Sequence, residues 1–244
     1  MLLEIDEMQT RRFNVVCAKL IGGPECESDL AEINKIAKAK QISLITTRVP
    51  VDDIRWIQNL EEDGFRLMDT LVYYGRKLND IDSSKISTPS MNVCLASKKD
   101  ANNVAEIARN AFKNYMGHFH ADPQLDNSAA DAAYVDWAAK SVESATNDSP
   151  VIVAKKDGRI VGFLTAKLHD TSLCEVILNG VHPDAQQQGV YPMMFSFIMD
   201  YFKNKNADRI IVSTQINNYA VQKAWSRLGL THNTSYYTLH KWVS

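Results

Sequence analysis

Apolar and polar residues follow two different periods along the first part of the chain. Three stretches rich in β-branched and apolar residues predict strands, at residues 11–21, 42–49 and 69–78. Between them, apolar residues recur at the spacing of amphipathic helices, namely Leu30, Ile33, Ile36 and Ala37, and then Ile54, Ile57 and Leu60. The pattern predicts a small α/β unit over residues 1–78.

A polar stretch interrupts these periods. Residues 79–92 contain four serines and Pro89, a composition typical of linkers. We therefore expect a linker over residues 79–90 and a second domain over residues 91–244.

The second domain is predicted to contain, in order, a strand, two helices, three antiparallel strands, a helix, a strand, a helix and a strand. Its clearest element is a hairpin over residues 151–168, where two apolar runs flank Asp157-Gly158. The four helices are predicted to begin near residues 100, 128, 189 and 218, and each carries an apolar stripe. The whole chain is thus predicted to be α/β, with a mixed, mostly antiparallel central sheet.

One short pattern occurs in both parts. Gly64-Phe65 followed by Tyr73-Tyr74 is echoed by Gly229-Leu230 followed by Tyr236-Tyr237. Either the chain contains a partial internal duplication, or two helix–glycine–strand units are alike by coincidence. The sequence leaves both explanations open.

Composition and charge exclude several classes of protein. The 244 residues are 45% hydrophobic and 23% charged with a formal net charge of −2, which fits neither a disordered chain nor a strongly basic nucleic-acid binder. No apolar run reaches the length of a membrane helix, and Glu4 and Asp6 do not fit a secretory signal. We expect a cytoplasmic protein with no nucleic-acid or membrane partner.

The four cysteines, Cys17, Cys26, Cys94 and Cys174, include no C-x-x-C pair. They are expected to be free thiols, and no metal site is predicted.

The most informative stretch is residues 179–195, where a strand, a polar loop and a glycine precede a helix. The first N–H groups of a helix are unpaired and lie at the positive end of its dipole, so they bind phosphate well. Gly189 would let a phosphate approach the main chain closely. Such an arrangement also occurs without any ligand, so this pattern alone indicates phosphate binding only weakly.

Two motifs make the chain resemble the GNAT acetyltransferase superfamily. The first is Q/R-x-x-G-x-G/A after a strand and a proline, matched here by Gln186 and Gly189 with Tyr191 at the second small position. The second is an asparagine-capped helix that runs into Gly-Phe, matched by Asn218, Trp225 and Gly229-Leu230. The order of elements in residues 91–244 is also similar to that fold.

This resemblance implies acetyl-CoA as co-substrate, without a metal. The pantetheine arm would lie along Asn179, Gly180 and Val181. The pyrophosphate would lie on the turn formed by Gln186, Gln187, Gln188, Gly189, Val190, Tyr191 and Pro192. Asn218 and Trp225 would face the pantetheine or the sulfur.

Two positions depart from the family pattern. Tyr191 replaces a small residue in the turn. Trp225 stands where many relatives have a tyrosine that protonates the leaving thiolate, and an indole N–H is a donor that cannot act as a useful acid. Trp225 therefore fits core packing, and a CoA-binding sensor without catalysis is an alternative function.

Glu175 is the candidate general base. By the two-residue period of a strand, Glu175 is expected to share one face with Ile177, Asn179 and Val181. The resemblance to the histone-acetylating branch of the superfamily assigns a glutamate six residues before the valine to deprotonation of the amine. A solvated strand glutamate without a role is the alternative.

Two segments make the chain similar to a narrower group, the nucleotide-amino-sugar acetyltransferases of the dTDP-fucosamine type. These are DGFRLMDTLVYYGRKL (63–78) and FHADPQLDNSAADAAYVDWAAKS (119–141). The resemblance implies an amine on a nucleotide-linked deoxysugar as acceptor, with a homodimer as an open option. The acceptor-site candidates are His118, Phe119, His120, Asp122, Tyr134 and Trp137. Each also fits loop or core packing, and another small amine or a protein amine is the alternative acceptor.

Overall fold

The ten strands form one continuous sheet in the computed structural model, which describes residues 3–23, 30–79 and 91–243. The strand order is β1-β2-β3-β10-β4-β9-β8-β7-β6-β5. The strands are β1 (Leu3–Ile5), β2 (Cys17–Leu20), β3 (Leu44–Pro50), β4 (Arg66–Lys77), β5 (Met91–Leu95), β6 (Val151–Lys156), β7 (Arg159–Leu168), β8 (Leu173–Val181), β9 (Arg209–Gln215) and β10 (Thr231–Trp242). The predicted mixed α/β class with a mostly antiparallel sheet is confirmed.

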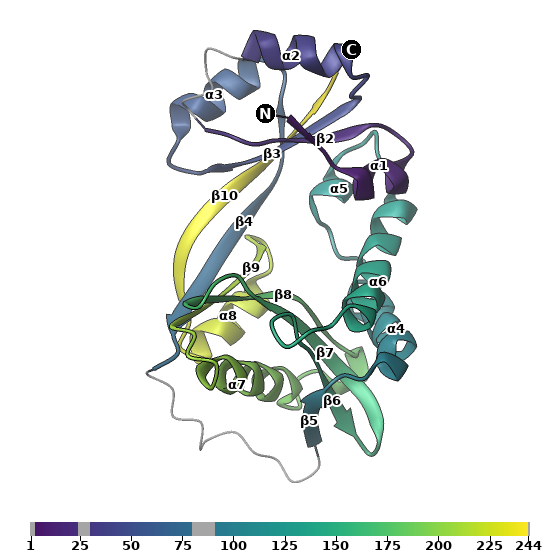
Figure 1. Cartoon of the computed structure of the whole chain (residues 1–244), viewed down its shortest axis with the longest axis vertical. Helices are drawn as coiled ribbons and strands as arrows, with labels where there is room; N and C mark the ends of the chain where they lie inside the picture. Colours follow the sequence, from purple (N-terminus) through teal and green to yellow (C-terminus); the bar gives the residue numbers. More distant parts are fainter. Residues whose placement is uncertain (1–2, 24–29, 80–90, 244) are drawn as a thin grey trace.

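Helices cover both faces of this sheet (Figure 1). The helices are α1 (Glu7–Phe13), α2 (Leu30–Ala39), α3 (Ile54–Glu62), α4 (Ala101–Ala111), α5 (His118–Ala121), α6 (Asn127–Glu143), α7 (Val190–Lys203) and α8 (Tyr219–Arg227). Apolar side chains of α2, α3, α7 and α8 fill the cores on one face, the outer face. Those of α1, α4, α5 and α6 lie on the other, which we call the inner face.

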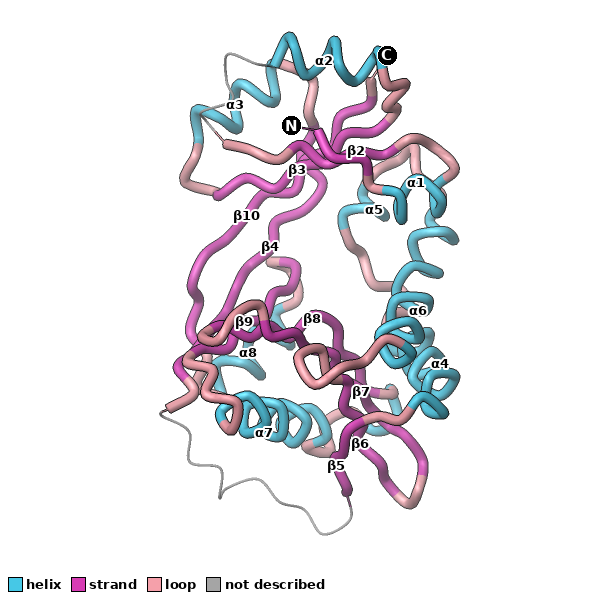
Figure 2. Tube along the Cα trace, in the orientation of Figure 1, coloured by secondary structure: helices cyan, strands magenta, loops and turns pink. Residues whose placement is uncertain are grey.

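The two parts of the chain exchange their last strands. β10 pairs with β3 along one edge and with β4 along the other, while β4 pairs with both β10 and β9. These two long strands run side by side between the ends of the molecule (Figure 2). The predicted division into domains stays a prediction, because the sheet is continuous and residues 80–90 of the expected linker lie outside the described residues.

The strand order favours internal duplication as the explanation of the glycine–tyrosine echo. On one side of the centre of the sheet, β10 is followed by the parallel strands β3 and β2. On the other side, β4 is followed by the parallel strands β9 and β8. Both β4 and β10 contain 12 residues. Gly64 and Gly229 precede them with positive φ of 91° and 77°. The two halves therefore repeat one topology around the centre of the sheet.

Most predicted elements are confirmed, with two corrections near the start of the chain. Residues 11–13 end a helix and do not begin a strand, because Asp6 caps α1 through Gln9 N–H and Asn14 ends it in the left-handed conformation. Ile54 was expected to point inward and is 53% exposed, whereas Trp56 is 1% exposed and fills that core. At the hairpin, Asp157 and Gly158 have φ of 50° and 77°, as the turn prediction requires.

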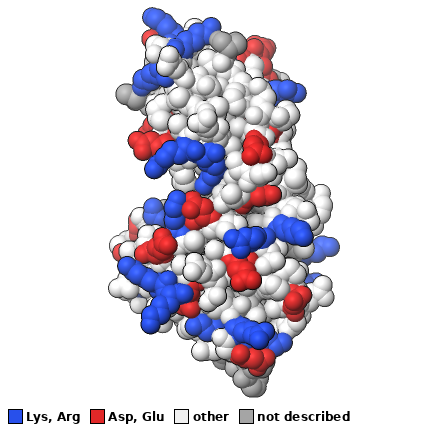
Figure 3. Space-filling model, turned by 90° about the vertical axis from the view of Figure 1, so that its right-hand side faces the viewer, with Lys and Arg blue, Asp and Glu red and all other residues white. Residues whose placement is uncertain are grey.

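In the part of the chain that the structure describes, no helix is long and apolar enough to cross a membrane. On the face that carries α1, α4, α5 and α6, lysine and arginine are interspersed with aspartate and glutamate (Figure 3). This face shows no broad basic surface of the kind that binds nucleic acid. Cys17, Cys94 and Cys174 are free thiols, and Cys26 lies outside the described residues.

Candidate active site

The N-terminus of α7 forms the backbone turn that the sequence predicted as a phosphate site. β8 ends at Val181, a short 3-10 turn spans Pro183–Ala185, and Gly189 precedes the helix. Gly189 has φ of 79°, a region that glycine occupies without strain. Met193 N–H donates to Gly189 O at 3.2 Å, which is the first hydrogen bond of the helix. The N–H groups before Met193 therefore have no acceptor within the helix.

The surroundings of this turn fit a pyrophosphate. No atom lies within 4 Å of the position that a Cβ at Gly189 would take, so the turn is open on that side. Lys156, from the end of β6, donates from Nζ to Gln188 Oε1 at 2.7 Å. Gln188 in turn donates from Nε2 to Asp184 O at 2.7 Å, which holds the turn in shape. The site thus combines free N–H groups with a lysine, the chemistry that an anion needs.

β8 and β9 separate beside this turn. They pair in parallel from Leu173 with Arg209 up to Val176 with Val212. Beyond this point β8 continues to Val181 and β9 to Gln215 without pairing with each other. The gap exposes the strand edges of residues 177–181, so backbone groups there can pair with an extended arm of a ligand.

A β-bulge in β8 overturns one expectation about Glu175. Thr165 of β7 faces Leu178, but the next residue, Ala166, faces Val176, so Ile177 is an extra residue. Val176 therefore packs towards α7 while Leu178 packs towards α4. The prediction that Glu175 shares a face with Val181 is wrong, because the bulge reverses the alternation between them. Glu175 lies on the inner face, where His169 Nε2 bonds its Oε2 at 2.7 Å.

Trp225 is a core residue. It is 1% exposed, and its Nε1–H donates to the Tyr191 hydroxyl at 2.6 Å. Burial raises the pKa of Tyr191, and the Trp225 hydrogen bond opposes that shift only in part. The Tyr191 ring, which replaces a small residue of the motif, is therefore accommodated with its hydroxyl directed towards α8. Asn218 precedes α8 and donates from Nδ2 to Thr214 Oγ1 at 3.0 Å.

The histidines of the acceptor-site prediction belong to two hydrogen-bonded groups. His118 Nδ1 lies 2.8 Å from His240 Nε2, and His240 Nδ1 lies 2.8 Å from Asp122 Oδ2. Trp242 Nε1–H also donates to Asp122, at 3.0 Å, so this buried carboxylate is fully engaged. Burial would raise the pKa of Asp122, but hydrogen bonds led by that from His240 outweigh it and lower the pKa. This network joins α5 to β10.

The other acceptor-site candidates lie in different surroundings. His120 Nε2 lies 3.0 Å from Asp131 Oδ1, and Phe119 packs against Phe13. Trp137 is 41% exposed and turned away from the core. Tyr134 stacks on Phe112 with ring centroids 4.7 Å apart, and its hydroxyl lies 2.6 Å from where a Cβ at Gly117 would be. Their acceptor roles stay predictions.

Several residues at the site were not predicted. Tyr115, in the segment between α4 and α5, hydrogen-bonds Gln215 at the end of β9. Gln215 Nε2 donates to Asp69 Oδ2 at 3.2 Å. Single polar residues on strands carry no periodic or motif signal, so only the fold brings them and Lys156 to the site.

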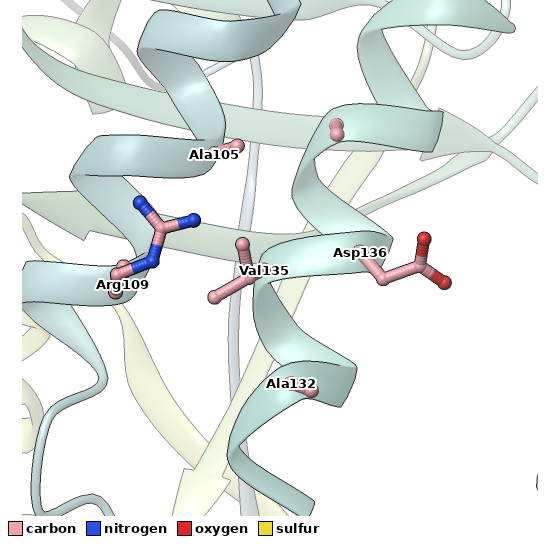
Figure 4. A pocket seen from close by; sticks show the side chains of 6 residues that line it. Ala105, Arg109, Ala132, Val135 and Asp136 are labelled. Atoms are coloured by element: carbon pink, nitrogen blue, oxygen red, sulfur yellow. The ribbon is translucent and has the colours of Figure 1, made fainter. Parts of the chain in front are cut away.

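Two hollows of the surface lie away from this turn. One of about 370 Å³ lies between α4 and α6 and is lined by three alanines, Val135, Arg109 and Asp136, and the Asp136 carboxylate points away from Arg109 (Figure 4). Another of about 310 Å³ adjoins α8 and Tyr74. No group of His, Cys, Asp and Glu side chains suited to a metal occurs among the described residues. The site is therefore defined by the α7 turn and the separated strands.

Comparison with known sequences links this geometry to one family. The sequence model of the acetyltransferase (GNAT) family matches residues 105–230, just over half of the 244-residue chain. The spore coat polysaccharide biosynthesis protein SpsD of Bacillus subtilis is 25% identical over 145 residues, which cover 59% of this chain and 48% of SpsD. The mycothiol acetyltransferase of Thermomonospora curvata is 24% identical over 96 residues, covering 39% and 32%. The chain spans about half or less of the curated relatives it matches.

Solved structures share the fold across nearly the whole chain. A GCN5-related N-acetyltransferase from Sphaerobacter thermophilus has a TM-score of 0.68 at 10% identity, covering 96% of this chain and 75% of that one. One from Kribbella flavida has a TM-score of 0.63 at 14% identity, covering 93% and 81%. A conserved protein of unknown function from Staphylococcus epidermidis has a TM-score of 0.62 at 16% identity, covering 94% and 85%. At these identities the likeness concerns the fold alone.

Proposed function

The chain belongs to the acetyltransferase (GNAT) family of acyltransferases, and we propose that it transfers the acetyl group of acetyl-CoA directly to a primary amine. The observation that carries this proposal is the open, glycine-led N-terminus of α7 beside the gap between β8 and β9. The turn would hold the pyrophosphate, with Lys156 as the added positive charge. The strand edges at Asn179–Val181 would hold the pantetheine arm.

Acetyl-CoA supplies an activated thioester, and the chain's residues do the rest. Glu175 accepts the proton that the amine must lose before it attacks, and His169 orients its carboxylate. Trp225 is buried and already donates to Tyr191, so we assign it no acid role. The thiolate is a modest base and can leave without a protein acid.

We propose an amine on a nucleotide-linked deoxysugar as the acceptor. The resemblance of residues 63–78 and 119–141 to the dTDP-fucosamine type supports this class, and so does the part of SpsD in spore coat polysaccharide biosynthesis. The acceptor would lie on the inner face near Tyr134 and His118. A homodimer and a cytoplasmic location complete the proposal. Another small amine is the alternative acceptor, and a CoA sensor is the alternative function.

A variant of Gly189 tests the co-substrate site. Gly189→Asp places a carboxylate where the pyrophosphate would lie, so acetyl-CoA affinity in titration calorimetry should fall about tenfold or more. Gly64→Asp is the matched control, because Gly64 also has positive φ and open space around its Cβ position. A folded Gly189→Asp protein with unchanged affinity would overturn the proposal. Release of CoA with a panel of amines then separates an enzyme from a sensor.

A further inference from the structure

Two neighbouring polar atoms on the inner face lack hydrogen-bond partners. Asp69 Oδ1 on β4 and Thr238 Oγ1 on β10 are both buried, and neither is paired within the described part of the chain. The two residues lie opposite each other in the β4–β10 register. A buried unpaired polar group costs about 1–3 kcal/mol, and more when it is charged. Two such atoms side by side therefore indicate that a partner is missing.

Arg48 continues the same line of residues. Thr238 faces Arg48 of β3 on its other side, so Asp69, Thr238 and Arg48 lie across three adjacent strands. We call these three residues the polar row. Thr238 and His240 point to the inner face, where His240 contacts α5, whereas Leu239 packs on the outer face. The row thus lies on the side where α5 faces β10 (Figure 1).

Opposite charges at the two ends of the row stay apart. Strands lie about 4.8 Å apart, so the Cα atoms of Arg48 and Asp69 are roughly 10 Å from each other. Within the described residues, no ion pair joins Arg48 to Asp69 or to any other carboxylate. Arg48 is exposed, whereas Thr238 and the Asp69 Oδ1 atom are buried, so the row runs from a buried end to a charge that solvent reaches. An accessible cation and a buried carboxylate oxygen without a partner, held apart, fit a bound molecule better than a purely structural role.

The row begins where the proposed active site ends. Gln215, the last residue of β9, donates to Asp69 Oδ2, and Tyr115 hydrogen-bonds Gln215. Gln215 lies past the point where β8 and β9 separate. Burial raises the pKa of Tyr134 to about 12, with Asp69 adding to the shift and Arg48 opposing it, so this ring lies close to both charges. From the thioester site, the row leads away across β4, β10 and β3.

We infer that the polar row binds the part of the acceptor remote from its amine, a hydroxylated body that ends in a phosphate. Asp69 and Thr238 would bind hydroxyl groups, and Arg48 would bind the phosphate. If the amine lies at the thioester, the hydroxyl-binding residues come next and the phosphate-binding arginine comes last. This order of groups matches an amino sugar that carries a phosphate. The inference rests on the proposed function for the position of the amine, but the binding that it requires does not need the amine.

Access to the row requires one movement. Both unpaired atoms are closed to solvent, and Tyr115 bridges to Gln215 beside them. Residues 112–117, which carry Tyr115, have no helix or strand structure. An acceptor would reach Asp69 by displacing this bridge.

Binding of sugars without an amine tests the row in the full chain. Calorimetric titrations with glucose 1-phosphate, dTDP-glucose, glucose and inorganic phosphate separate the contributions of sugar, phosphate and nucleotide. We expect the two sugar phosphates to bind, and glucose and inorganic phosphate to bind at least about tenfold more weakly. A wild-type protein that acetylates amines but binds neither sugar phosphate would overturn the inference alone. A protein that binds them but acetylates no amine would overturn the proposed function alone.

Three variants locate the binding. Arg48→Met and Asp69→Asn should each weaken dTDP-glucose binding about tenfold or more, with acetyl-CoA affinity unchanged. Asp208→Asn, at an exposed position before β9, is the matched control for Asp69→Asn. Thr238→Val should weaken sugar binding while leaving stability unchanged or higher, because its hydroxyl has no partner among the residues that the structure describes. Sugar phosphate binding that survives all three changes would overturn the inference.

Discussion

A single extra residue in β8 decides which way Glu175 points. Without the bulge at Ile177, Glu175 would face α7 and the co-substrate turn together with Val181. With it, Glu175 faces the inner side, the side on which Gln215 and Tyr115 also lie. The bulge therefore separates the proposed proton acceptor from the pyrophosphate turn, so the two can serve different substrates.

Glu175→Gln tests whether Glu175 accepts the proton of the amine. At pH 7 we expect kcat to fall about 10²-fold, the usual contribution of a general base, while acetyl-CoA affinity stays unchanged. The loss should shrink at higher pH, because solvent then supplies more unprotonated amine. Steady-state kinetics between pH 7 and 9 measure both effects, and His169→Gln is a milder companion change. An unaltered kcat at pH 7 would assign the proton transfer to water or to His120.

Among the elements, α5 is short and depends on a buried network for its position. With four residues, it cannot be stable by its own backbone bonds. The bonds from His118 through His240 to Asp122 fix it on β10 instead. Its placement therefore depends on the ionised Asp122 carboxylate.

Asp122→Asn should lower the free energy of unfolding by about 1.5–3 kcal/mol, the range for hydrogen bonds to a charged group. The pKa of Asp122 is lowered in the fold, so its carboxylate stabilises the protein above the unfolded pKa of about 4, and this stability is lost as the pH falls further. Urea denaturation should thus show a constant difference between pH 7 and 5. A difference that already shrinks over that window would point to histidine titration instead.

The first turn of α7 and the last turn of α8 are joined by a hydrogen bond from Trp225 Nε1–H to Tyr191 Oη. Tyr191→Phe leaves the buried indole N–H unpaired, so we expect a loss of about 1–3 kcal/mol in denaturant unfolding. Tyr201→Phe is the matched control, since its hydroxyl donates to Asn147 O near the surface. Equal losses in the two variants would show that the α7–α8 bond contributes nothing special.

At the scale of the whole molecule, the sequence predicted the helices and strands far better than it predicted which strands lie next to each other in the sheet. Periodicity identified α2, β3 and the hairpin because each depends on local side-chain spacing. It could not show that β10 enters between β3 and β4, since a strand with buried residues on both faces fits many positions in a sheet. The α7 turn was predictable because a motif encodes its backbone. Asp69, Thr238 and Arg48 were not, because β10, which is distant in sequence from β3 and β4, brings them into one row.

The exchange of strands predicts that residues 91–244 cannot fold alone. β10 pairs only with β3 and β4, and both lie outside that fragment. The fragment should therefore lack a cooperative unfolding transition in circular dichroism and bind acetyl-CoA poorly. Adding residues 1–78 as a separate chain should restore both properties. A lone fragment with a sharp transition and full affinity would contradict this.

The position of β10 also sets the order of events during synthesis on the ribosome. From Pro50 at the end of β3 to Thr231 at the start of β10, translation at about 5–20 residues per second takes roughly 10 to 40 seconds. Until β10 has been made, the edges of β3 and β4 that pair with it stay open. Open strand edges of this kind attract other chains. The nascent protein thus depends on dilution or on chaperones until its central strand has been made.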